Sequence, residues 1–530
     1  MSSENLAQSN PRIDKHSDST FEMDDRADFD NLAWDRNDEA WEQSQKFFRQ
    51  ISTLRKIEAF VTEKMGKRAT WVSPLIVGGY NNLYRMRIEG SPHDVMIRLP
   101  QHHRCQFPDE KTMREAATAI FVAEKTAIPV PRVLFHGKST PDSQIGPFII
   151  IEHVENSGSM SHALAMPNKT DPTESHMLNP DISEDFLEMS YCGAAVHVLQ
   201  LFQPKFGRIG SLVQANKGFA VAGRPITQNM NNMLQLANIP RTALPPEDRT
   251  YATADEWYVA LANMHLVQLV FQHNDLVSTA DECRNMYVAR QLFRKLAMRG
   301  RLSTFGFAED NWSARSKARG PPLPPAPSRS EAFRLWCDDL RPGNMLLNDA
   351  GEAVVLIDWE FTYAAPTQFA LDPPWWLLLN VPEMWHTNIE DWASVYGARL
   401  STWLRAMGKA EDGAAAGARG IGGVRLSTYM RESWETGRFW LNYAARKSWA
   451  FDAIFWKYLD EPLFGSREGG TPMPRTELWK TRLHLLSERE RNAMEPFVER
   501  KMRESKERIL VDWNDEQVKE RMAEVLFEDE

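Results

Sequence analysis

The stretch of sequence that decides the fold runs from Leu335 to Trp359 and reads LWCDDLRPGNMLLNDAGEAVVLIDW. Within it, Met345–Leu347 and Ala353–Ile357 are short apolar runs rich in aliphatic residues, which is typical of β-strands. The turn-forming cluster Asn348–Gly351 separates them. We therefore expect the two runs to pair as an antiparallel hairpin.

Three oxygen-bearing side chains are expected to meet at the open end of this hairpin. If the turn is centred on Gly351, equal counting along both strands places Asn344 opposite Asp358. Asp339 lies on the loop just before Asn344, and no thiol or imidazole is among the three. Such oxygen ligands suit Mg²⁺, which takes one or two protein side chains and leaves its other positions to water and phosphate. The stretch thus predicts a magnesium site.

Upstream of the hairpin, residues 38–155 are predicted to form a compact α+β unit. Apolar residues between Phe47 and Met65 recur at every third or fourth position, which indicates one amphipathic helix. Strand-like runs and one helix follow it, at residues 71–77, 83–88, 95–99, 109–126 (the helix), 132–135 and 147–151. The remainder, residues 156–530, is predicted to be mostly helical, with long helices near 255–300, 390–408 and 425–460.

The composition limits the classes of protein to consider. The formal net charge is −10, and the first 45 residues hold 12 acidic and 4 basic ones, so residues 1–37 are predicted to be a disordered acidic tail. The rest of the chain has no basic excess, which argues against a nucleic-acid binder. No apolar run approaches the ~18 residues of a membrane span, so no membrane contact is expected. With four single cysteines and no signal or transit pattern, a cytoplasmic location is expected.

A proline-rich tract at residues 320–327, GPPLPPAP, is predicted to be extended. Its P-x-x-P spacing, with Arg319 and Arg329 nearby, fits an SH3-type partner. A stiff surface spacer is the commoner role of such a tract. Both alternatives stay open at this point.

The spacing D-x-x-x-x-N, followed by a hairpin that ends in Asp, is the catalytic arrangement of eukaryotic-type kinases. The runs CDDLRPGN (337–344) and IDWEF (357–361) resemble the aminoglycoside phosphotransferase and choline kinase group. Together with DPPWW (372–376), they resemble a fungal branch of that group. The resemblance covers residues 73–376 in motif order, although most of 212–330 cannot be placed. It implies a protein-kinase-like, two-lobed α+β fold with a small β-rich N-lobe and a large, mostly helical C-lobe.

The resemblance also implies roles for single residues. Asp339, with the required offset to Asn344, resembles the catalytic aspartate that orients the acceptor hydroxyl and takes its proton. Asn344 and Asp358 resemble the two magnesium ligands. Gly78 and Gly79 occupy the place of the loop whose backbone amides cover the nucleotide phosphates.

Two further features of the upstream unit match the same pattern. Arg98 stands where the group carries a basic residue on its third strand, and a guanidinium can hold two phosphate oxygens at once. Glu115 on the following helix is expected to pair with it, although a surface ion pair is an equally good interpretation of the two residues alone. The backbone from Glu152 to Val154 matches the hinge that bonds adenine.

These residues predict a phosphotransferase that uses ATP and Mg²⁺ to phosphorylate a hydroxyl of a small molecule. A protein kinase is disfavoured, because the segment after Asp358 leaves no room for a long activation loop. Nearby carboxylates, with Trp359 or Trp375 offering an aromatic face, favour an amino- or ammonium-bearing acceptor; they are Asp338, Asp339, Asp358 and Glu360. The alternative is a nucleotide-binding pseudokinase that acts as a scaffold without transferase activity.

Overall fold

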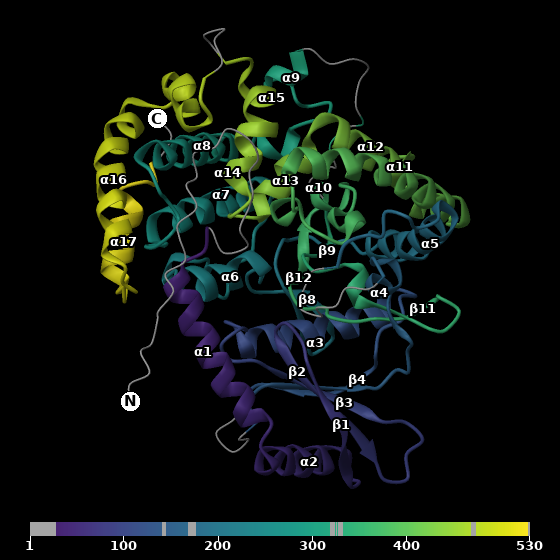
Figure 1. Ribbon diagram of the computed structural model, residues 1–530. Helices are drawn as coiled ribbons and strands as arrows, with labels where there is room; N and C mark the ends of the chain where they lie inside the picture. The colour runs from purple at the N-terminus through teal and green to yellow at the C-terminus, as the bar shows by residue number, and fades with distance from the viewer. Residues whose placement is uncertain are drawn as a thin grey trace, which may run out of the picture.

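The computed structural model describes residues 28–139, 145–167, 176–317, 324, 326, 332–467 and 473–527. A small lobe built on an antiparallel sheet lies beside a large lobe built mostly of helices, as Figure 1 shows. Each lobe has its own cluster of buried apolar side chains. The predicted two-lobed α+β architecture, with a small β-rich lobe and a large, mostly helical lobe, is therefore confirmed.

The small lobe is organised around one five-stranded antiparallel sheet in the order β1-β2-β3-β5-β4. Every second residue of β2, namely Tyr84, Met86 and Ile88, is buried, as the two-residue period of a strand requires. The elements agree closely with the predicted ones: β1 (Ala69–Val77), β2 (Asn81–Ile88), β3 (Val95–Pro100), α3 (Pro108–Lys125), β4 (Val133–Gly137) and β5 (Phe148–Glu152).

Two helices, α1 (Asn31–Phe48) and α2 (Ile51–Met65), precede the sheet, where the sequence predicted one. The break falls at Gln50, which is extended with φ −69° and ψ 139°. The helix also starts earlier than expected, so the prediction of disorder is wrong for residues 31–37. Asp30 caps α1 and is fully buried against the large lobe, a tertiary contact that composition does not reveal. Residues 1–27 of the predicted tail lie outside the described residues.

The large lobe consists mainly of helices that pack around one extended apolar core. The helices predicted near 255–300 and 390–408 correspond to α7 with α8 and to α11, while several shorter helices occupy 425–460. The helices of this lobe are α4 (Met160–Leu164), α5 (Glu184–Leu201), α6 (Gln228–Ala237), α7 (Ala254–Phe271), α8 (Ala280–Met298), α9 (Ala314–Lys317), α10 (Thr367–Ala370), α11 (Ile389–Gly413), α12 (Leu426–Thr436), α13 (Arg438–Arg446), α14 (Phe451–Ile454), α15 (Asp460–Phe464), α16 (Glu488–Glu507) and α17 (Asp515–Ala523).

Short strands of the large lobe hold the stretch that decides the fold. The expected hairpin forms between β10 (Met345–Leu347) and β11 (Ala353–Leu356), and β6 (Gly158–Ser159) extends it. A second pair, which the sequence did not predict, joins β9 (Phe333–Cys337) to β12 (Thr362–Pro366). Two further hairpins are β7 (Leu212–Ala215) with β8 (Gly218–Val221), and β13 (Gly420–Ile421) with β14 (Val424–Arg425).

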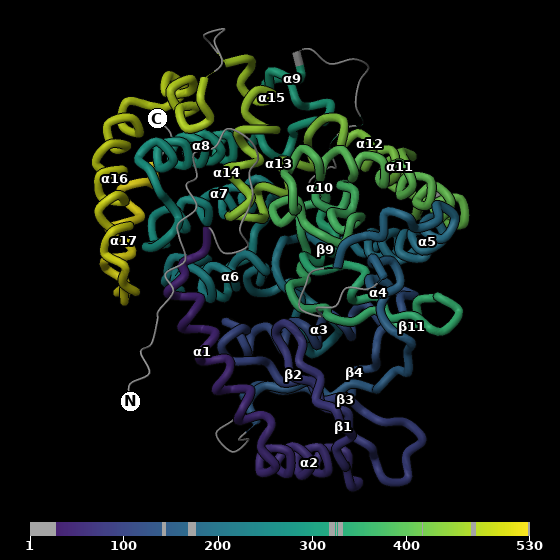
Figure 2. Tube along the Cα trace, in the orientation of Figure 1, coloured from purple at the N-terminus to yellow at the C-terminus, as the bar shows by residue number. Residues whose placement is uncertain are grey.

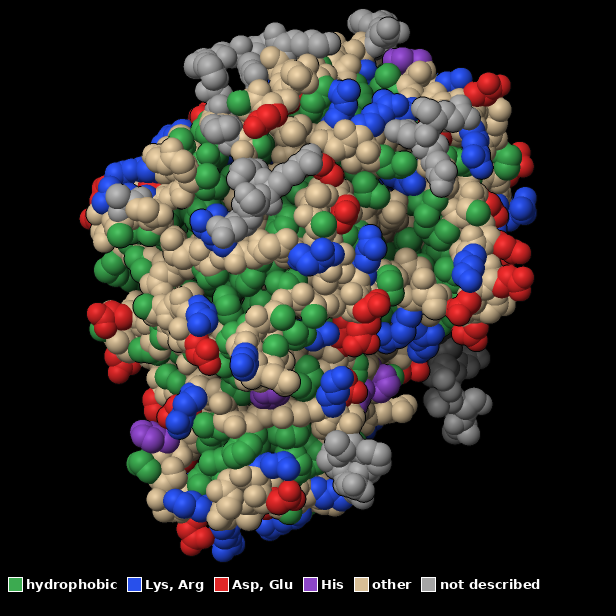
Figure 3. Space-filling model, turned by 180° about the vertical axis from the view of Figure 1, so that it is seen from behind, with side chains coloured by type: hydrophobic (Ala, Val, Ile, Leu, Met, Phe, Trp, Pro, Cys, Tyr) green, Lys and Arg blue, Asp and Glu red, His purple; other side chains and the backbone are tan. Residues whose placement is uncertain are grey.

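Two features bear on partners. No helix among the described residues is long and apolar enough to cross a membrane. On the face turned away from the viewer of Figure 1, acidic and basic side chains are interspersed over both lobes instead of forming one basic patch among the described residues (Figure 3). The proline tract falls almost wholly outside the described residues, so the SH3-type partner stays a prediction.

Candidate active site

The β10–β11 hairpin forms, but its register differs by one residue from equal counting. The N–H of Ile357 donates to the carbonyl of Asn344 at 3.0 Å, so Ile357, and not Asp358, lies opposite Asn344. The turn is centred on Ala350 instead of Gly351, because Leu347 pairs with Ala353 and the N–H of Asn348 donates to the carbonyl of Glu352 at 3.0 Å. A bulge between Leu346 and Leu347, which adds one residue on the β11 side, then moves the partner of Asn344 from Leu356 to Ile357. Counting along the sequence could detect neither the turn centre nor the bulge.

The chain leaves β11 through an unusual backbone segment. Asp358 and Phe361 have φ values of 61° and 58°, a left-handed conformation that is uncommon for residues other than glycine. These turns lead into β12, which pairs back onto β9. As a result, the loop at residues 338–344 faces the segment at 357–361, and the N–H of Asp338 donates to the carbonyl of Phe361 at 3.2 Å. Strain of this kind is often retained at functional sites.

Asp339 lies in the centre of this arrangement. The Nδ2 of Asn344 donates to the Asp339 carbonyl at 2.8 Å and to its Oδ2 at 3.3 Å. The Nε of Arg341 is 3.0 Å from its Oδ1. Burial raises the pKa of Asp339, the charge of Asp358 adds to the rise, and Arg341 opposes it. Of the three oxygen-bearing side chains predicted to converge, Asp339 and Asn344 are in contact, and Asp358 lies near enough for its charge to raise the pKa of Asp339.

The neighbouring Asp338 has a different environment. Its Oδ1 accepts from the indole N–H of Trp336 at 2.8 Å, and its Oδ2 accepts from the backbone N–H of Gln228 at 3.3 Å. Gln228 is the first residue of α6, so this carboxylate fixes a helix terminus to the loop. Asp338 therefore has a structural role, which leaves Asp339 as the candidate for catalysis.

The expected pair between Arg98 and Glu115 forms inside the molecule. The guanidinium is 2.9 Å from the Glu115 carboxylate, and both side chains are 5% exposed. The same guanidinium also pairs with Asp358. Burial opposes the charged form of Asp358, but Arg98 outweighs burial and lowers its pKa. Arg98 on β3 and Glu115 on α3 are thereby connected to the segment that carries Asp358.

A second buried ion pair was not predicted from the sequence. The Nζ of Lys111 pairs with Glu360 and lies 3.3 Å from Oε2 of Glu115 and 3.2 Å from Oδ1 of Asn81. Burial raises the pKa of Glu360 to about 7 despite this cation. One signal existed in the sequence, because Lys111 precedes Glu115 by four residues and so shares its helix face.

The loop that contains Gly78 and Gly79 folds down onto the same segment. Tyr80 packs edge-on against Phe361, with ring centroids 5.0 Å apart. The Nδ2 of Asn81 donates to Oε2 of Glu360 at 3.1 Å. The two residues that follow the glycines thus contact the segment at residues 358–361. That Gly78 and Gly79 cover a nucleotide stays a prediction.

The predicted hinge lies at the end of β5, where the chain passes between the lobes. Glu152 pairs with Val95 in the sheet, and the N–H of His153 donates to the carbonyl of Asp94 at 3.1 Å. The carbonyl of Val154 accepts from Nδ2 of Asn156 at 3.1 Å. Contact of Glu152 and Val154 with adenine stays a prediction.

The argument for an amino-bearing acceptor is weakened by these contacts. Of the four carboxylates invoked, Asp358, Asp339 and Glu360 already have a cation, and Asp338 has two N–H donors. The expected aromatic face is also wrong for Trp359, which is 3% exposed and donates to the Leu356 carbonyl at 3.3 Å. Local negative charge is therefore largely compensated, because each buried carboxylate needs a partner.

The residues present fit Mg²⁺ and a nucleotide. Among the described residues there is no group of three or more His, Cys, Asp or Glu that could hold a metal. Asn344 and Asp358 offer an amide and a carboxylate oxygen. The Nε of Arg98 is buried without a hydrogen-bond partner in the described residues, so one donor remains for a phosphate oxygen.

Replacing Asp339 by Asn should stabilise the protein at pH 7. Because burial raises the pKa of Asp339 above that of the unfolded chain, folding favours the protonated form and the charged form costs stability at neutral pH. The variant should therefore show the higher Tm at pH 7, and the difference should vanish near pH 3, below the ordinary pKa of about 3.9. Thermal unfolding at both pH values measures this. A lower Tm for Asp339→Asn at pH 7 would contradict it.

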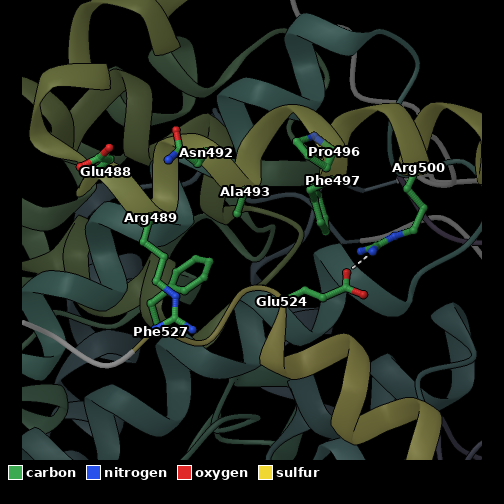
Figure 4. Close-up of a pocket in the computed structure, with 9 residues that line it drawn as sticks. All are labelled: Glu488, Arg489, Asn492, Ala493, Pro496, Phe497, Arg500, Glu524 and Phe527. Carbon is green, nitrogen blue, oxygen red and sulfur yellow. Dashed lines mark hydrogen bonds and ion pairs between the residues drawn. The ribbon is translucent and has the colours of Figure 1, made fainter.

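A separate pocket of about 750 Å³ lies on the large lobe along α16 (Figure 4). Arg489 lies beside Phe527, and Arg500 pairs with Glu524 across it. None of the residues discussed above lines this pocket. It therefore belongs to the packing of the C-terminal helices and not to the candidate active site.

No family model matches this chain. A search of the curated proteins found no significant match.

Solved structures with a similar course of the chain were found. An ethanolamine kinase of Plasmodium vivax is 12% identical, with 89% of this chain and 95% of that chain covered and a TM-score of 0.37. The aminoglycoside phosphotransferase APH(4)-Ia is 13% identical, with 76% and 97% covered and a TM-score of 0.36. A microcompartment-associated aminopropanol kinase is 11% identical, with 84% and 98% covered and a TM-score of 0.35. This is a likeness of fold alone.

Proposed function

We propose that this protein is a small-molecule kinase that transfers the terminal phosphoryl group of ATP to a hydroxyl, with Mg²⁺ as cofactor. The observation that carries the proposal is the contact of Asp339 with Asn344, in the loop that faces Asp358, joined to the buried pair of Arg98 and Glu115. Burial also raises the pKa of Asp339, and groups with shifted pKa values are concentrated at functional sites.

In this proposal each residue has one task. Asn344 and Asp358 hold Mg²⁺, which neutralises charge on the phosphates when bound. Arg98 contacts a phosphate oxygen and is oriented by Glu115. Asp339 accepts the proton of the acceptor hydroxyl. The hydroxyl oxygen bonds to the terminal phosphorus of ATP as the bond between that phosphorus and the bridging oxygen breaks, and ADP leaves with the bridging oxygen. A raised pKa suits this task, because a base is most effective when its pKa approaches the working pH.

The loop and the hinge complete the nucleotide site in the same proposal. Backbone amides near Gly78 and Gly79 cover the phosphates, and the backbone from Glu152 to Val154 bonds the adenine. Membership of the fungal branch of the aminoglycoside phosphotransferase and choline kinase group stays a prediction, as does a cytoplasmic location.

The alternative is a pseudokinase scaffold, and one observation favours it. Arg98 pairs directly with Asp358, so a proposed metal ligand is engaged by a cation of the protein itself. For an active enzyme, Mg²⁺ must compete with this contact. Turnover separates the two functions, because a scaffold binds nucleotide without transferring a phosphoryl group.

ATP is expected to raise the Tm of the protein only when Mg²⁺ is present. A ligand that binds the folded state alone stabilises it by about 2.7 kcal/mol at 100 times its Kd. Thermal unfolding with ATP or ADP, each with and without Mg²⁺, measures this, and a screen of hydroxylated small molecules for ATP consumption follows. The absence of any nucleotide effect would overturn the proposed function, whereas binding without turnover of any acceptor would favour the scaffold.

The same screen tests the acceptor class. An amino- or ammonium-bearing alcohol is the prediction from the sequence, and cationic, neutral and anionic alcohols should be compared in one assay. Robust turnover of a neutral sugar, with cationic alcohols inert, would contradict that prediction and leave the kinase assignment standing.

A further inference from the structure

Helix α1 contacts both lobes, as Figures 1 and 2 show, and its first turn is fixed to the large lobe. Oδ2 of the fully buried Asp30 accepts from the Nδ2 of Asn274 at 2.8 Å, and the N–H of Asp30 donates to the carbonyl of Leu236 at 3.0 Å. One helical turn after Ala33, Asn37 donates to the carbonyl of Gln235 at 2.6 Å. The start of α1 therefore has a position set by α6 and by the loop after α7.

The second half of α1 is bound to the small lobe. The indole N–H of Trp41 donates to Oε1 of Gln101 at 2.6 Å, and Nε2 of Gln45 donates to Oδ1 of Asn82 at 3.1 Å. Phe48, the last residue of the helix, lies in the apolar core of the small lobe. A single helix thus joins the two lobes outside the hinge.

Gln101 connects α1 to the glycine loop. Its side chain is fully buried, and its Nε2 donates to the carbonyls of Gly78 at 2.9 Å and Asn81 at 3.1 Å. Its backbone N–H donates to the carbonyl of Tyr80 at 2.8 Å. One residue therefore holds three carbonyls of the loop that contains Gly78 and Gly79.

The orientation of the Gln101 amide depends on Trp41. With Oε1 directed at the indole N–H, Nε2 faces the loop carbonyls, and every buried polar atom of the amide has a partner. The reversed amide would direct its oxygen at those carbonyls and leave the indole N–H without an acceptor, which is costly in a buried site. The donor on α1 thus selects the orientation that binds the loop.

The loop needs such support because its own sequence provides little rigidity. Gly78 and Gly79 have more backbone freedom than any other residue type, and a Cβ built on Gly79 would meet nothing within 4 Å. Within the loop, the N–H of Gly78 donates to the carbonyl of Asn81 at 2.8 Å. Its contacts with the rest of the protein include Gln101 on one side and, on the other, Tyr80 against Phe361 and Asn81 with Glu360 and Lys111. Backbone amides can bind phosphate well only if they are held in place before binding.

We propose that α1 is an interlobe brace and that Trp41, acting through Gln101, is a positioning residue for the loop that covers the nucleotide. Nucleotide affinity is then set in part by a helix that does not touch the nucleotide. The predicted effect on ATP affinity rests on the proposed function. The predicted effect of Trp41 on the rigidity of the loop that contains Gly78 and Gly79 does not.

The variant Trp41→Phe removes the indole N–H and part of the ring system but keeps an aromatic ring that can pack under Arg104, whose guanidinium is 4.3 Å from the Trp41 ring. Gln101→Glu is the second variant, because it replaces the donating Nε2 by an oxygen. Both should raise amide hydrogen exchange in residues 78–82 about tenfold, the equivalent of one hydrogen bond. Both should also weaken Mg-ATP binding and raise KM for ATP about tenfold, with kcat within a few fold. The matched control Gln43→Ala, an exposed α1 residue, should change neither.

Three results would decide the proposal. Faster exchange in 78–82 together with a raised KM for ATP, at an unchanged kcat, supports it. Unchanged exchange in both variants overturns the brace, and faster exchange with unchanged nucleotide affinity overturns the positioning role. If the wild-type protein binds no nucleotide, the proposed function falls, while the exchange measurement still judges the brace.

Discussion

Replacing Asp358 by Asn is expected to abolish the Mg²⁺-dependent part of the stabilisation by ATP while the protein stays folded. The carboxylate is the charged one of the two proposed metal ligands, and an amide of the same shape cannot replace its charge. Asn is chosen because it tolerates the left-handed φ of 61° at this position better than Ala. At an ATP concentration of 100 times Kd, the wild type should gain about 2.7 kcal/mol and the variant close to none.

The chain offers a matched control for this experiment. Asp349 lies at the opposite, exposed end of the same hairpin, so Asp349→Asn makes the same chemical change away from the site. This variant should respond to Mg-ATP as the wild type does. If Asp358→Asn keeps the full Mg²⁺-dependent shift in Tm, the metal assignment is wrong, because the ion then has other ligands.

Asp339→Asn is expected to slow phosphoryl transfer by ~10²–10⁴, the usual contribution of a positioned acid or base. Its affinity for Mg-ATP should stay within a few fold of the wild type, because the proposed role of Asp339 begins only when an acceptor is bound. Steady-state turnover and nucleotide titration measure the two quantities separately. The same variant should be the more stable protein at pH 7, so a loss of rate cannot be attributed to unfolding.

The adjacent carboxylate provides the comparison. Asp338→Asn replaces one of the two accepting oxygens by an NH2 group, so either the indole of Trp336 or the N–H of Gln228 loses its acceptor. The variant should therefore lower the Tm more than it lowers the rate per folded molecule. A larger loss of rate in Asp338→Asn than in Asp339→Asn would show that the choice between the two residues is wrong.

Much of the candidate site could be predicted from the sequence because its residues lie close together along the chain. Asp339, Asn344 and Asp358 belong to one stretch, in which apolar runs and a turn cluster predict a hairpin. The strands of the small lobe were predictable for the same reason, since alternation and turn residues act over a few positions. The ion pair of Arg98 and Glu115 could not be predicted from local sequence patterns. It was predicted only from the resemblance to a known family.

The tertiary structure alone decided the rest. The turn centre at Ala350 and the bulge in β10–β11 together set the partner of Asn344, and the pairing of β9 with β12 placed the Asp339 loop against the Asp358 segment. Lys111 and Glu360 are 249 positions apart, and α1 reaches both lobes through Asp30 and Trp41. Helical periodicity shows that a face will be buried but not against what, and a buried charge acquires its partner only when distant segments pack together and exclude water.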